Sequence, residues 1–281
     1  MLASRNYPPS AGLTPFIARH YVFASDVPGY ELADFSLPDM ALLCVVQQGE
    51  WATQRPGGNW VIASDIHFFG PVSRCLPVRV KAPFQLVGTA FRPSGWRALF
   101  DRPASQFADL MLPVDEVWPG GNRRLREMIG KRSNPPDVIR ALEDETVHQL
   151  NRIGGWQVDE AMRAFEHIAQ TDSTRQVKDV AAELGLSPRQ FERHCLHCFG
   201  HSPKLVLRRS RFLDMATVLR GLARPSEEQL AELRYFDQSH RNREFKQFIN
   251  MTPQQFVQTA TPLFTPTLKV RLMGNSGADI N

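Results

Sequence analysis

The potential metal ligands of this chain gather in one short segment, at His194, Cys195, His197, Cys198 and His201. Imidazole and thiolate are ligands that zinc prefers, and the Cys-x-x-Cys spacing occurs in thiol redox pairs. Zinc sites usually take ligands from two separated segments, however, and no carboxylate or base is placed beside these thiols to make them catalytic. We therefore predict no metal and no cofactor, and a thiol- or metal-sensing function stays open as an alternative.

The other motifs and the composition argue against an enzyme. The sequence contains no G-x-S-x-G, P-loop, Rossmann or H-E-x-x-H pattern. Its four cysteines are too few for a disulfide framework in 281 residues. No apolar run reaches the roughly 20 residues that span a bilayer, and residues 1–10 lack the apolar segment of a secretory signal. These features predict a non-enzymatic, cytoplasmic protein with reduced thiols and no membrane partner.

The positive charge is concentrated toward the C-terminus. Between residues 170 and 260 there are 14 Lys and Arg against 10 Asp and Glu, so the net charge of +4 arises entirely there. Phosphate contacts of a nucleic-acid-binding protein need such a surplus. The charge distribution favours double-stranded DNA as a partner of this part of the chain.

The spacing of Ala181, Gly185 and Phe191 predicts a helix-turn-helix unit. A small Ala lets two helices cross closely, Gly takes the left-handed conformation of the turn, and the large apolar residue anchors the second helix. Ser187-Pro188 would cap and start this second helix, whose opposite face is free to enter the major groove. The residues that then point outward are Arg189, Glu192 and Arg193. Arg can bond guanine with two hydrogen bonds, and Glu can accept one from cytosine.

An internal repeat with a shift of 50 residues indicates a second unit of the same kind. The paired positions are Val180-Ala181 with Leu230-Ala231, Ser187 with Asp237, Arg193 with Arg243, Cys195 with Phe245, Phe199 with Ile249, Gly200 with Asn250, and Ser202-Pro203 with Thr252-Pro253. A helix over 203–222 would join the two units. Two recognition helices on one frame can enter successive major-groove segments about 34 Å apart.

The residues of this repeat closely resemble the AraC/XylS family of transcriptional regulators. The first unit resembles it from Asp179-Val180-Ala181 through Phe199-Gly200-His201-Ser202-Pro203. The second does so over Tyr235–His240, Arg243–Phe248 and Met251-Thr252-Pro253. The resemblance implies a seven-helix DNA-binding domain, RNA polymerase as a partner, and an N-terminal domain that senses a small molecule or mediates dimerisation. Carried over by position, the residues that face the bases are Arg189, Glu192 and Arg193 in the first unit, and Gln238, Ser239, Asn242 and Arg243 in the second.

Two residues of the second unit depart from the family pattern. Arg234 stands where the turn usually has Gly, and Arg241 stands where the family has an apolar anchor. We expect Arg241 to lay its methylenes over the core and direct its guanidinium to the surface, toward Glu244. These departures leave open an alternative function, a ligand- or partner-binding protein with a degenerate second DNA-reading unit.

The first hundred residues contain segments rich in Val, Ile, Leu and aromatic residues, which predict strands at His20–Ser25, Met40–Glu50, Asn59–Phe69 and Phe84–Phe91. A cupin-like barrel fits this pattern, but the only histidines before residue 148 are His20 and His67, which mark no cupin metal site. Arg92, at the end of a strand, would hold an acidic ligand or be a solvated turn residue. The effector, if there is one, is not identified by these residues.

The whole chain is predicted to have an α+β fold. It comprises an N-terminal β-rich, cupin-like domain with a helical segment, and a C-terminal all-α domain with two helix-turn-helix units. The helix over 137–153 has an apolar face suited to a homodimer, and Gly154-Gly155 ends it. We predict domains at 1–155 and 156–262, and a weakly ordered tail at 263–281.

Overall fold

The computed structural model describes residues 2–38, 40–55, 58–63, 65–130, 134–223 and 238–276. The strands are β1 Ala3–Tyr7, β2 Ile17–Ser25, β3 Glu31–Ser36, β4 Leu42–Gln48, β5 Trp51–Gln54, β6 Trp60–Ala63, β7 Ile66–Phe69, β8 Leu76–Lys81, β9 Phe84–Phe91 and β10 Met111–Pro113. The helices are α1 Trp96–Leu99, α2 Gly121–Ile129, α3 Pro135–Ile153, α4 Glu160–Thr171, α5 Val177–Glu183, α6 Pro188–Phe199, α7 Pro203–Leu219, α9 Gln238–Ile249, α10 Pro253–Gln258 and α11 Phe264–Ser276. Single 3-10 turns lie at η1 Ala11–Leu13, η2 Pro93–Gly95, η3 Ala104–Gln106 and η4 Val114–Glu116.

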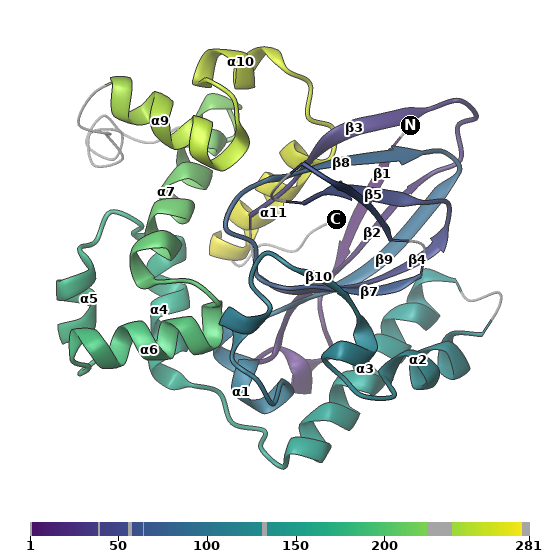
Figure 1. Ribbon diagram of the computed structural model, residues 1–281, viewed down its shortest axis with the longest axis horizontal. Helices are drawn as coiled ribbons and strands as arrows, with labels where there is room; N and C mark the ends of the chain where they lie inside the picture. Colours follow the sequence, from purple (N-terminus) through teal and green to yellow (C-terminus); the bar gives the residue numbers. More distant parts are fainter. Residues whose placement is uncertain are drawn as a thin grey trace.

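The strands form two antiparallel sheets that face each other (Figure 1). The larger sheet has the order β1-β2-β9-β4-β7-β10 and the smaller has the order β3-β8-β5-β6. In the larger sheet Val87 pairs with Val22 on one side and Val45 on the other, and these three pack toward the helices. The neighbouring residues Tyr21 and Leu86 pack between the sheets instead. The central strands are therefore buried on both faces, as their nearly continuous apolar sequences require.

The predicted β-rich domain is confirmed, with two differences in detail. The expected strand Asn59–Phe69 is two strands, β6 and β7, which belong to different sheets. The strands β1, β3, β5, β8 and β10 were not predicted. In β8 the period-2 signal is present, since Leu76, Val78 and Val80 are buried in alternation with Pro77, Arg79 and Lys81.

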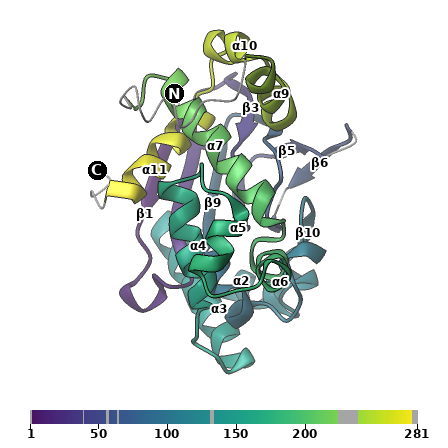
Figure 2. The ribbon, with the colours of Figure 1, turned by 90° about the vertical axis from the view of Figure 1, so that its left-hand side faces the viewer.

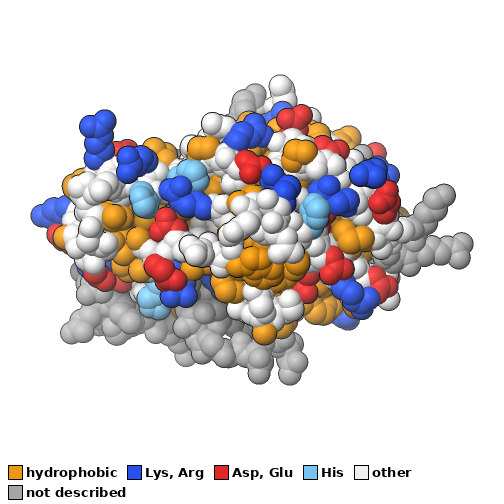
Figure 3. Space-filling view, turned by 90° about the horizontal axis from the view of Figure 1, so that it is seen from below, with side chains coloured by type: hydrophobic (Ala, Val, Ile, Leu, Met, Phe, Trp, Pro, Cys, Tyr) orange, Lys and Arg blue, Asp and Glu red, His pale blue; other side chains and the backbone are white. Residues whose placement is uncertain are grey.

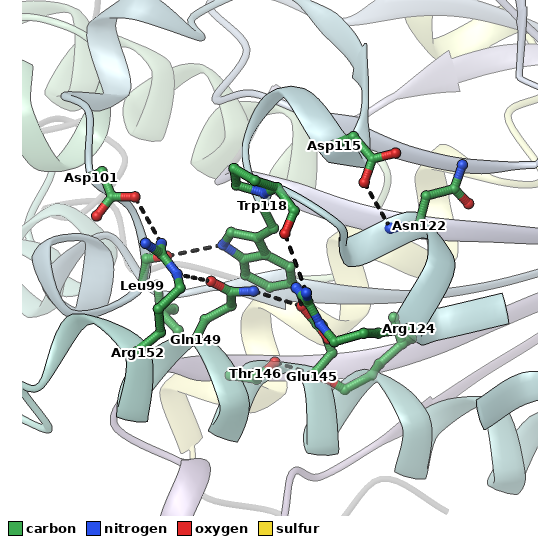
Figure 4. Close-up of polar contacts among 12 residues, drawn as sticks. Leu99, Asp101, Asp115, Trp118, Asn122, Arg124, Glu145, Thr146, Gln149 and Arg152 are labelled. Atoms are coloured by element: carbon green, nitrogen blue, oxygen red, sulfur yellow. Dashed lines mark hydrogen bonds and ion pairs between the residues drawn. The ribbon is translucent and has the colours of Figure 1, made fainter. Parts of the chain in front are cut away.

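The helices α2 and α3 cover the larger sheet and are held by a buried carboxylate (Figure 4). Glu145 of α3 is 1% exposed and accepts two hydrogen bonds from Arg124 of α2, at 2.8 and 2.7 Å. Gln149 donates to the same carboxylate and accepts from Arg152, which also binds Asp101. A buried charge is tolerated only when it is paired and bonded in this way. The network fixes the apolar face of α3 against the rest of the N-terminal half.

The predicted helical C-terminal domain is confirmed, and most of its helix ends lie where the capping residues indicate. Gly154 ends α3 with φ of 80°, and Gly185 follows α5 with φ of 66°. The start of α5 is an exception, because the Ser173-x-x-Gln176 pattern does not cap it. Ser173 is buried and donates to the carboxylate of Asp214 at 2.6 Å, and the helix begins four residues later at Val177. The helix expected over 203–222 ends at Leu219.

The end of the chain differs from the expected weakly ordered tail. Residues Phe264–Ser276 form α11, and Phe264 and Leu268 are fully buried. The capping and turn signals of this segment are weak, with Pro262 and Pro266 near its start, whereas its apolar residues find partners in α7 and α10. Tertiary burial therefore decides its structure. Among the described residues, no helix combines the length and the apolar character needed to cross a bilayer.

Candidate nucleic-acid interface

The first helix-turn-helix consists of α5 and α6, with Gly185 in the turn between them. Ser187 caps α6 by accepting a hydrogen bond from the backbone N–H of Gln190, whose side chain accepts in return from the backbone N–H of Ser187. Pro188 occupies the first helical position, where its missing N–H costs nothing. The start of α6 is therefore fixed by local chemistry that can be seen in the sequence.

The inward face of α6 is apolar and completely covered. Phe191 and Cys195 have 0% exposure, and Ala181 of α5 has 1%. The ring of Phe191 meets Phe165 of α4 edge-on, with 4.8 Å between the ring centroids. This packing anchors α6 and leaves its other face to solvent.

The three residues predicted to read bases in the first unit lie together on that outward face. Arg189, Glu192 and Arg193 are all exposed, at helical spacings of three and four residues. Seen from below, Lys and Arg side chains project from the left-hand end of the molecule, where α5 and α6 lie (Figure 3). The structure thus places two guanidinium groups and a carboxylate on one exposed face of α6.

The second unit is described only from α9 onward. Residues 224–237, including Arg234 and the paired positions Leu230, Ala231 and Asp237, lie outside the described residues. Of the four predicted contact residues, Ser239 and Arg243 are exposed on α9 and Asn242 is half-buried. Gln238 is the first residue of α9, and its side chain lies outside the described part.

The repeat continues in the geometry of the backbone after each recognition helix. Gly200 has φ of 74° and Asn250 has φ of 57°, so both end their helices in the left-handed conformation. Ser202 accepts from the N–H of Leu205, and Thr252 accepts from the N–H of Gln255, so both prolines follow a capping side chain. Phe245, Phe248 and Ile249 form the buried face of α9. The two units share one backbone plan from the recognition helix onward.

Arg241 does not pair with Glu244, which corrects that expectation. The carboxylate of Glu244 is buried and accepts from Arg208 of α7 at 2.5 Å, and His240 lies 3.7 Å from it. Arg241 itself is half-buried, and its Nε is buried without a hydrogen-bond partner among the described residues. Arg208 reaches this carboxylate because α7 packs against α9.

The long helix α7 sets the distance between the two recognition helices. The helix has 17 residues and carries α6 at one end and α9 at the other (Figures 1 and 2). In Figure 2 the two recognition helices lie one above the other on the same side of α7. This arrangement allows both to approach one face of a duplex.

Polar contacts tie the first unit to the N-terminal domain. Arg92 is partly exposed, and its Nη1 donates to Glu166 of α4 at 2.6 Å. Asp159 binds His194 of α6 at 3.2 Å and Arg97 of α1 at 3.5 Å. The carboxylate side chains of Glu166 and Asp159 are at most 11% exposed, whereas their partners Arg92 and Arg97 are 34% and 43% exposed. Sequence reasoning missed these contacts because their partners lie about 35 to 75 positions away and carry no shared motif.

The side chains of the His and Cys cluster at residues 194–201 have different surroundings. Cys195 and Cys198 are fully buried, and desolvation raises the pKa of both thiols, that of Cys198 to about 12. His201 donates from Nε2 to the carbonyl of Pro71 at 3.1 Å, whereas His194 turns toward Asp159. The described residues contain no group of three or more side chains arranged to hold a metal ion.

A cavity lies between the two sheets of the N-terminal domain. The cavity is partly open to solvent. The lining is mainly apolar and includes Tyr21, Phe23, Trp51, Phe69, Leu86 and Leu263. Asn6, Arg19, Ser36 and Thr53 add polar groups. Sequence reasoning missed this cavity because four of the lining strands, β1, β3, β5 and β8, were not predicted.

Comparisons with known proteins divide the chain in the same way as the structure. Residues 180–259 match a helix-turn-helix domain family, and residues 5–113 match a domain family of unknown function (DUF6597). A search of curated proteins returned no match. The helix-turn-helix match spans both units of the repeat and the helix between them.

Solved structures show distant similarity. ToxT from Vibrio cholerae is 10% identical over 85% of this chain and 97% of its own, with a TM-score of 0.46. A ToxT structure with an unsaturated fatty acid bound is 11% identical over 87% and 96%, with a TM-score of 0.45. The AraC-like activator CuxR is 11% identical over 76% and 95%, with a TM-score of 0.25. These values are too low to fix a fold or a ligand for this chain. On their family match, residues 180–259 form a helix-turn-helix domain, whose motifs resemble those of the AraC/XylS family of transcriptional regulators.

Proposed function

We propose that the chain is an effector-responsive regulator that reads DNA with α6 and α9 and senses a small molecule in its N-terminal domain. In this proposal residues 1–155 form the sensing part and residues 156–262 form the DNA-binding part. The observation that carries it is the capped helix α6, with a fully buried inner face and three exposed charged residues on its outer face. A chain with no DNA partner would not need to repeat this plan at the other end of α7.

The residues proposed to contact DNA differ in the bases that they suit and in their exposure. In α6, Arg189 and Arg193 suit guanine, and Glu192 suits cytosine. In α9, Ser239 and Arg243 stand free to contact bases, whereas the half-buried Asn242 would need a closer approach of the groove. Gln238, at the start of α9, completes the predicted set, since the N-terminal residues of a recognition helix reach bases first.

The effector site that we infer is the cavity between the sheets. Its lining favours a largely apolar small molecule with one or two hydrogen-bonding groups, which Ser36, Thr53 or Asn6 would meet. Tyr21 and Cys44 already bind each other at 2.9 Å inside the cavity wall. Burial raises the pKa of both groups, that of Cys44 to about 12, so neither supplies a charge to the ligand.

RNA polymerase and a second copy of the chain remain proposed partners. The apolar face of α3 that suggested a homodimer is used within the chain, since Val138, Leu142 and Leu150 have 0% exposure. The exposed residues in the middle of α3 are Arg140, Asp144 and His148, which are polar. A dimer would need another surface. Sedimentation at tens of micromolar, with and without DNA, tests it, and a monomer under both conditions would remove it.

Recovery of bound fragments from genomic DNA, followed by sequencing, tests the proposed function and yields the site. With such a fragment, Arg193→Ala should weaken binding by about 1–3 kcal/mol, because it removes a bidentate base contact. Its fold stability should hardly change, because the side chain is exposed. Arg123→Ala, which removes an exposed Arg of α2, is the matched control and should leave DNA affinity within a factor of two or so.

The salt dependence and a second variant separate the remaining alternatives. Specific binding should fall steeply as salt increases, because phosphate contacts release counterions. Specific binding that survives Arg193→Ala intact would show that α6 does not read bases. If Arg243→Ala has no effect either, residues outside the predicted set read the bases. If duplex DNA shows only weak, non-specific attraction and no fragment is recovered, the chain is better described as a ligand- or partner-binding protein with degenerate DNA-reading units.

A further inference from the structure

The C-terminal helix α11 joins two separate cores of the molecule. It begins after residue 259, where the helix-turn-helix match ends. Leu263, just before the helix, packs among the side chains between the two sheets. Phe264 and Leu268 pack in the core formed by α7, α9 and α10. In Figure 1 the helix lies between the sheets and α7.

In the second unit, α11 contributes side chains to the core that packs against α9. The ring of Phe264 meets Phe256 of α10 edge-on with 5.7 Å between centroids, and Phe256 in turn lies 5.7 Å from Phe245 of α9. Leu268 has 0% exposure in the same cluster. Arg271 binds Asp214 of α7 at 3.0 Å. The inward seating of α9 therefore depends on side chains that α11 supplies.

On the side of the sheets, one buried carboxylate holds the start of α11. Oδ2 of Asp34, in β3, accepts from the N–H of Leu263 at 2.6 Å and of Phe264 at 3.2 Å. The first N–H groups of a helix have no partners within it, so this carboxylate satisfies donors that otherwise need water. Burial raises the pKa of Asp34 to about 6, and the three backbone hydrogen bonds to it act in the opposite direction. The group is therefore mostly ionised at neutral pH.

The same segment lines the cavity assigned to the effector. Leu263 and Thr267 are its two lining residues from the C-terminal end of the chain, and all the others come from the N-terminal domain. A ligand in the cavity touches these side chains only while α11 is in place. It therefore binds more tightly to the chain with α11 docked than to the chain with α11 released.

We propose that α11 is a clamp through which a ligand in the sheet cavity stabilises the docked position of the second DNA-reading unit. This inference rests on the proposed function, because it takes that cavity as the effector site. Coupling between two sites is reciprocal, so a docked α11 strengthens ligand binding and a bound ligand holds α11 in place. The ligand then orders α9 and raises DNA affinity. The first unit is held by Arg92, Glu166 and Asp159 instead and stays unaffected.

Hydrogen exchange of the full-length protein without DNA tests the mechanical link. Asp34→Asn keeps the side-chain volume, but its amide N–H₂ must face either the N–H of Phe35 or those of Leu263 and Phe264. We expect amide exchange in α11 and α9 to accelerate about fivefold or more, with α6 unchanged. Lys269→Ala, at an exposed position of α11, is the matched control and should change neither helix. Leu263→Ala provides a second route to the same result if Asp34→Asn folds poorly.

The amphiphilic probe 8-anilinonaphthalene-1-sulfonate, which has an apolar ring system, tests whether a ligand in the cavity acts on α11. It should bind the wild-type protein, slow the exchange of α11 and α9, and bind at least about fivefold more weakly to Leu263→Ala. Faster exchange of α11 with no change in α9 would overturn the clamp. A probe that fails to bind, or binds without slowing α11, would overturn control by the cavity. Because these measurements need no DNA, a failure of DNA binding would count against the proposed function alone.

Discussion

The two DNA-reading units share a backbone plan but are fixed to the molecule by different means. The first has an aromatic anchor, Phe191, and polar contacts to the N-terminal domain. The second has a half-buried Arg241 at the anchor position and is joined to that domain by the backbone bond from Cys75 N–H to the Phe248 carbonyl and by α11. A repeated motif can therefore keep its reading geometry while one copy is fixed and the other depends on a neighbouring helix.

The largest expected difference between the units is in their anchors. Phe191→Ala removes a fully buried ring and should lower the free energy of unfolding by about 3–5 kcal/mol. Arg241→Ala truncates a half-buried side chain and should cost less than about 1 kcal/mol. Chemical denaturation of both variants measures the contrast. Equal losses would show that the second unit has an anchor as strong as the first.

A pH effect on the first unit should come from His201. His201 is 7% exposed, and burial lowers its pKa to about 4, with nearby Arg209 acting in the same direction and Asp109 against it. In the unfolded chain the imidazole takes up a proton near pH 6.5. Between pH 6.5 and 4 it is therefore protonated in the unfolded chain and neutral in the folded one. Above pH 6.5 the titration of His201 therefore does not change the free energy of unfolding. As the pH decreases from 6.5 to 4, it lowers that free energy by up to about 1.4 kcal/mol per pH unit.

Replacement of His201 isolates this contribution. His201→Asn keeps a donor for the Pro71 carbonyl and removes the titration, so the fall in stability below pH 6.5 should become shallower. Met251 occupies the paired position of the second unit and cannot titrate. Denaturation at several pH values, compared with the wild type, checks this, and the other histidines cancel in the difference. Parallel pH profiles would mean that His201 is protonated in the folded protein.

The second unit should gain from an apolar anchor. Arg241→Phe would replace a guanidinium whose Nε is buried without a partner among the described residues by a ring that can pack on the core of α9. Burying that ring can contribute on the order of 1.5–3 kcal/mol. The melting temperature should therefore rise, and DNA affinity should not fall. A destabilised variant would show that the rest of the Arg241 side chain makes contacts that outweigh the gain.

Local sequence signals predicted the parts of the fold that local chemistry decides. Ser187-Pro188, Gly185, Gly200 and Asn250 determine helix ends within a few residues, and they were recognised from the sequence. Ser173 shows the limit, since its hydroxyl binds Asp214, 41 positions away, instead of capping α5. The same limit explains α11, whose own sequence signals are weak and whose apolar side chains are buried by α7 and α10.

In the candidate site, too, local features could be predicted from the sequence and long-range contacts could not. The exposed triad of α6 follows from helix periodicity and could be placed from the sequence alone. The contacts of Arg92 with Glu166, and the cavity behind Tyr21, depend on which strands pair and which domain faces lie together. Neither is encoded in a short segment. Arg241 could be recognised as unusual, but its separation from Glu244 required the position of Arg208.

The smallest expected effect comes from exchanging the two residues that end the recognition helices. Gly200 and Asn250 both have positive φ, a conformation that Asn tolerates better than most residues. Their surroundings differ, because a Cβ at Gly200 would lie 3.1 Å from the Ala104 carbonyl oxygen and 3.2 Å from Pro71, whereas Asn250 is exposed. Gly200→Asn should therefore cost of the order of 1 kcal/mol through overpacking. Asn250→Gly should change stability by less than about 0.5 kcal/mol, because the relief at positive φ is offset by the greater freedom of the unfolded chain. Thermal denaturation of both variants decides the matter. If Gly200→Asn leaves the stability unchanged, the first unit can shift away from Ala104 and Pro71. The first unit would then not be held more rigidly than the second at this contact.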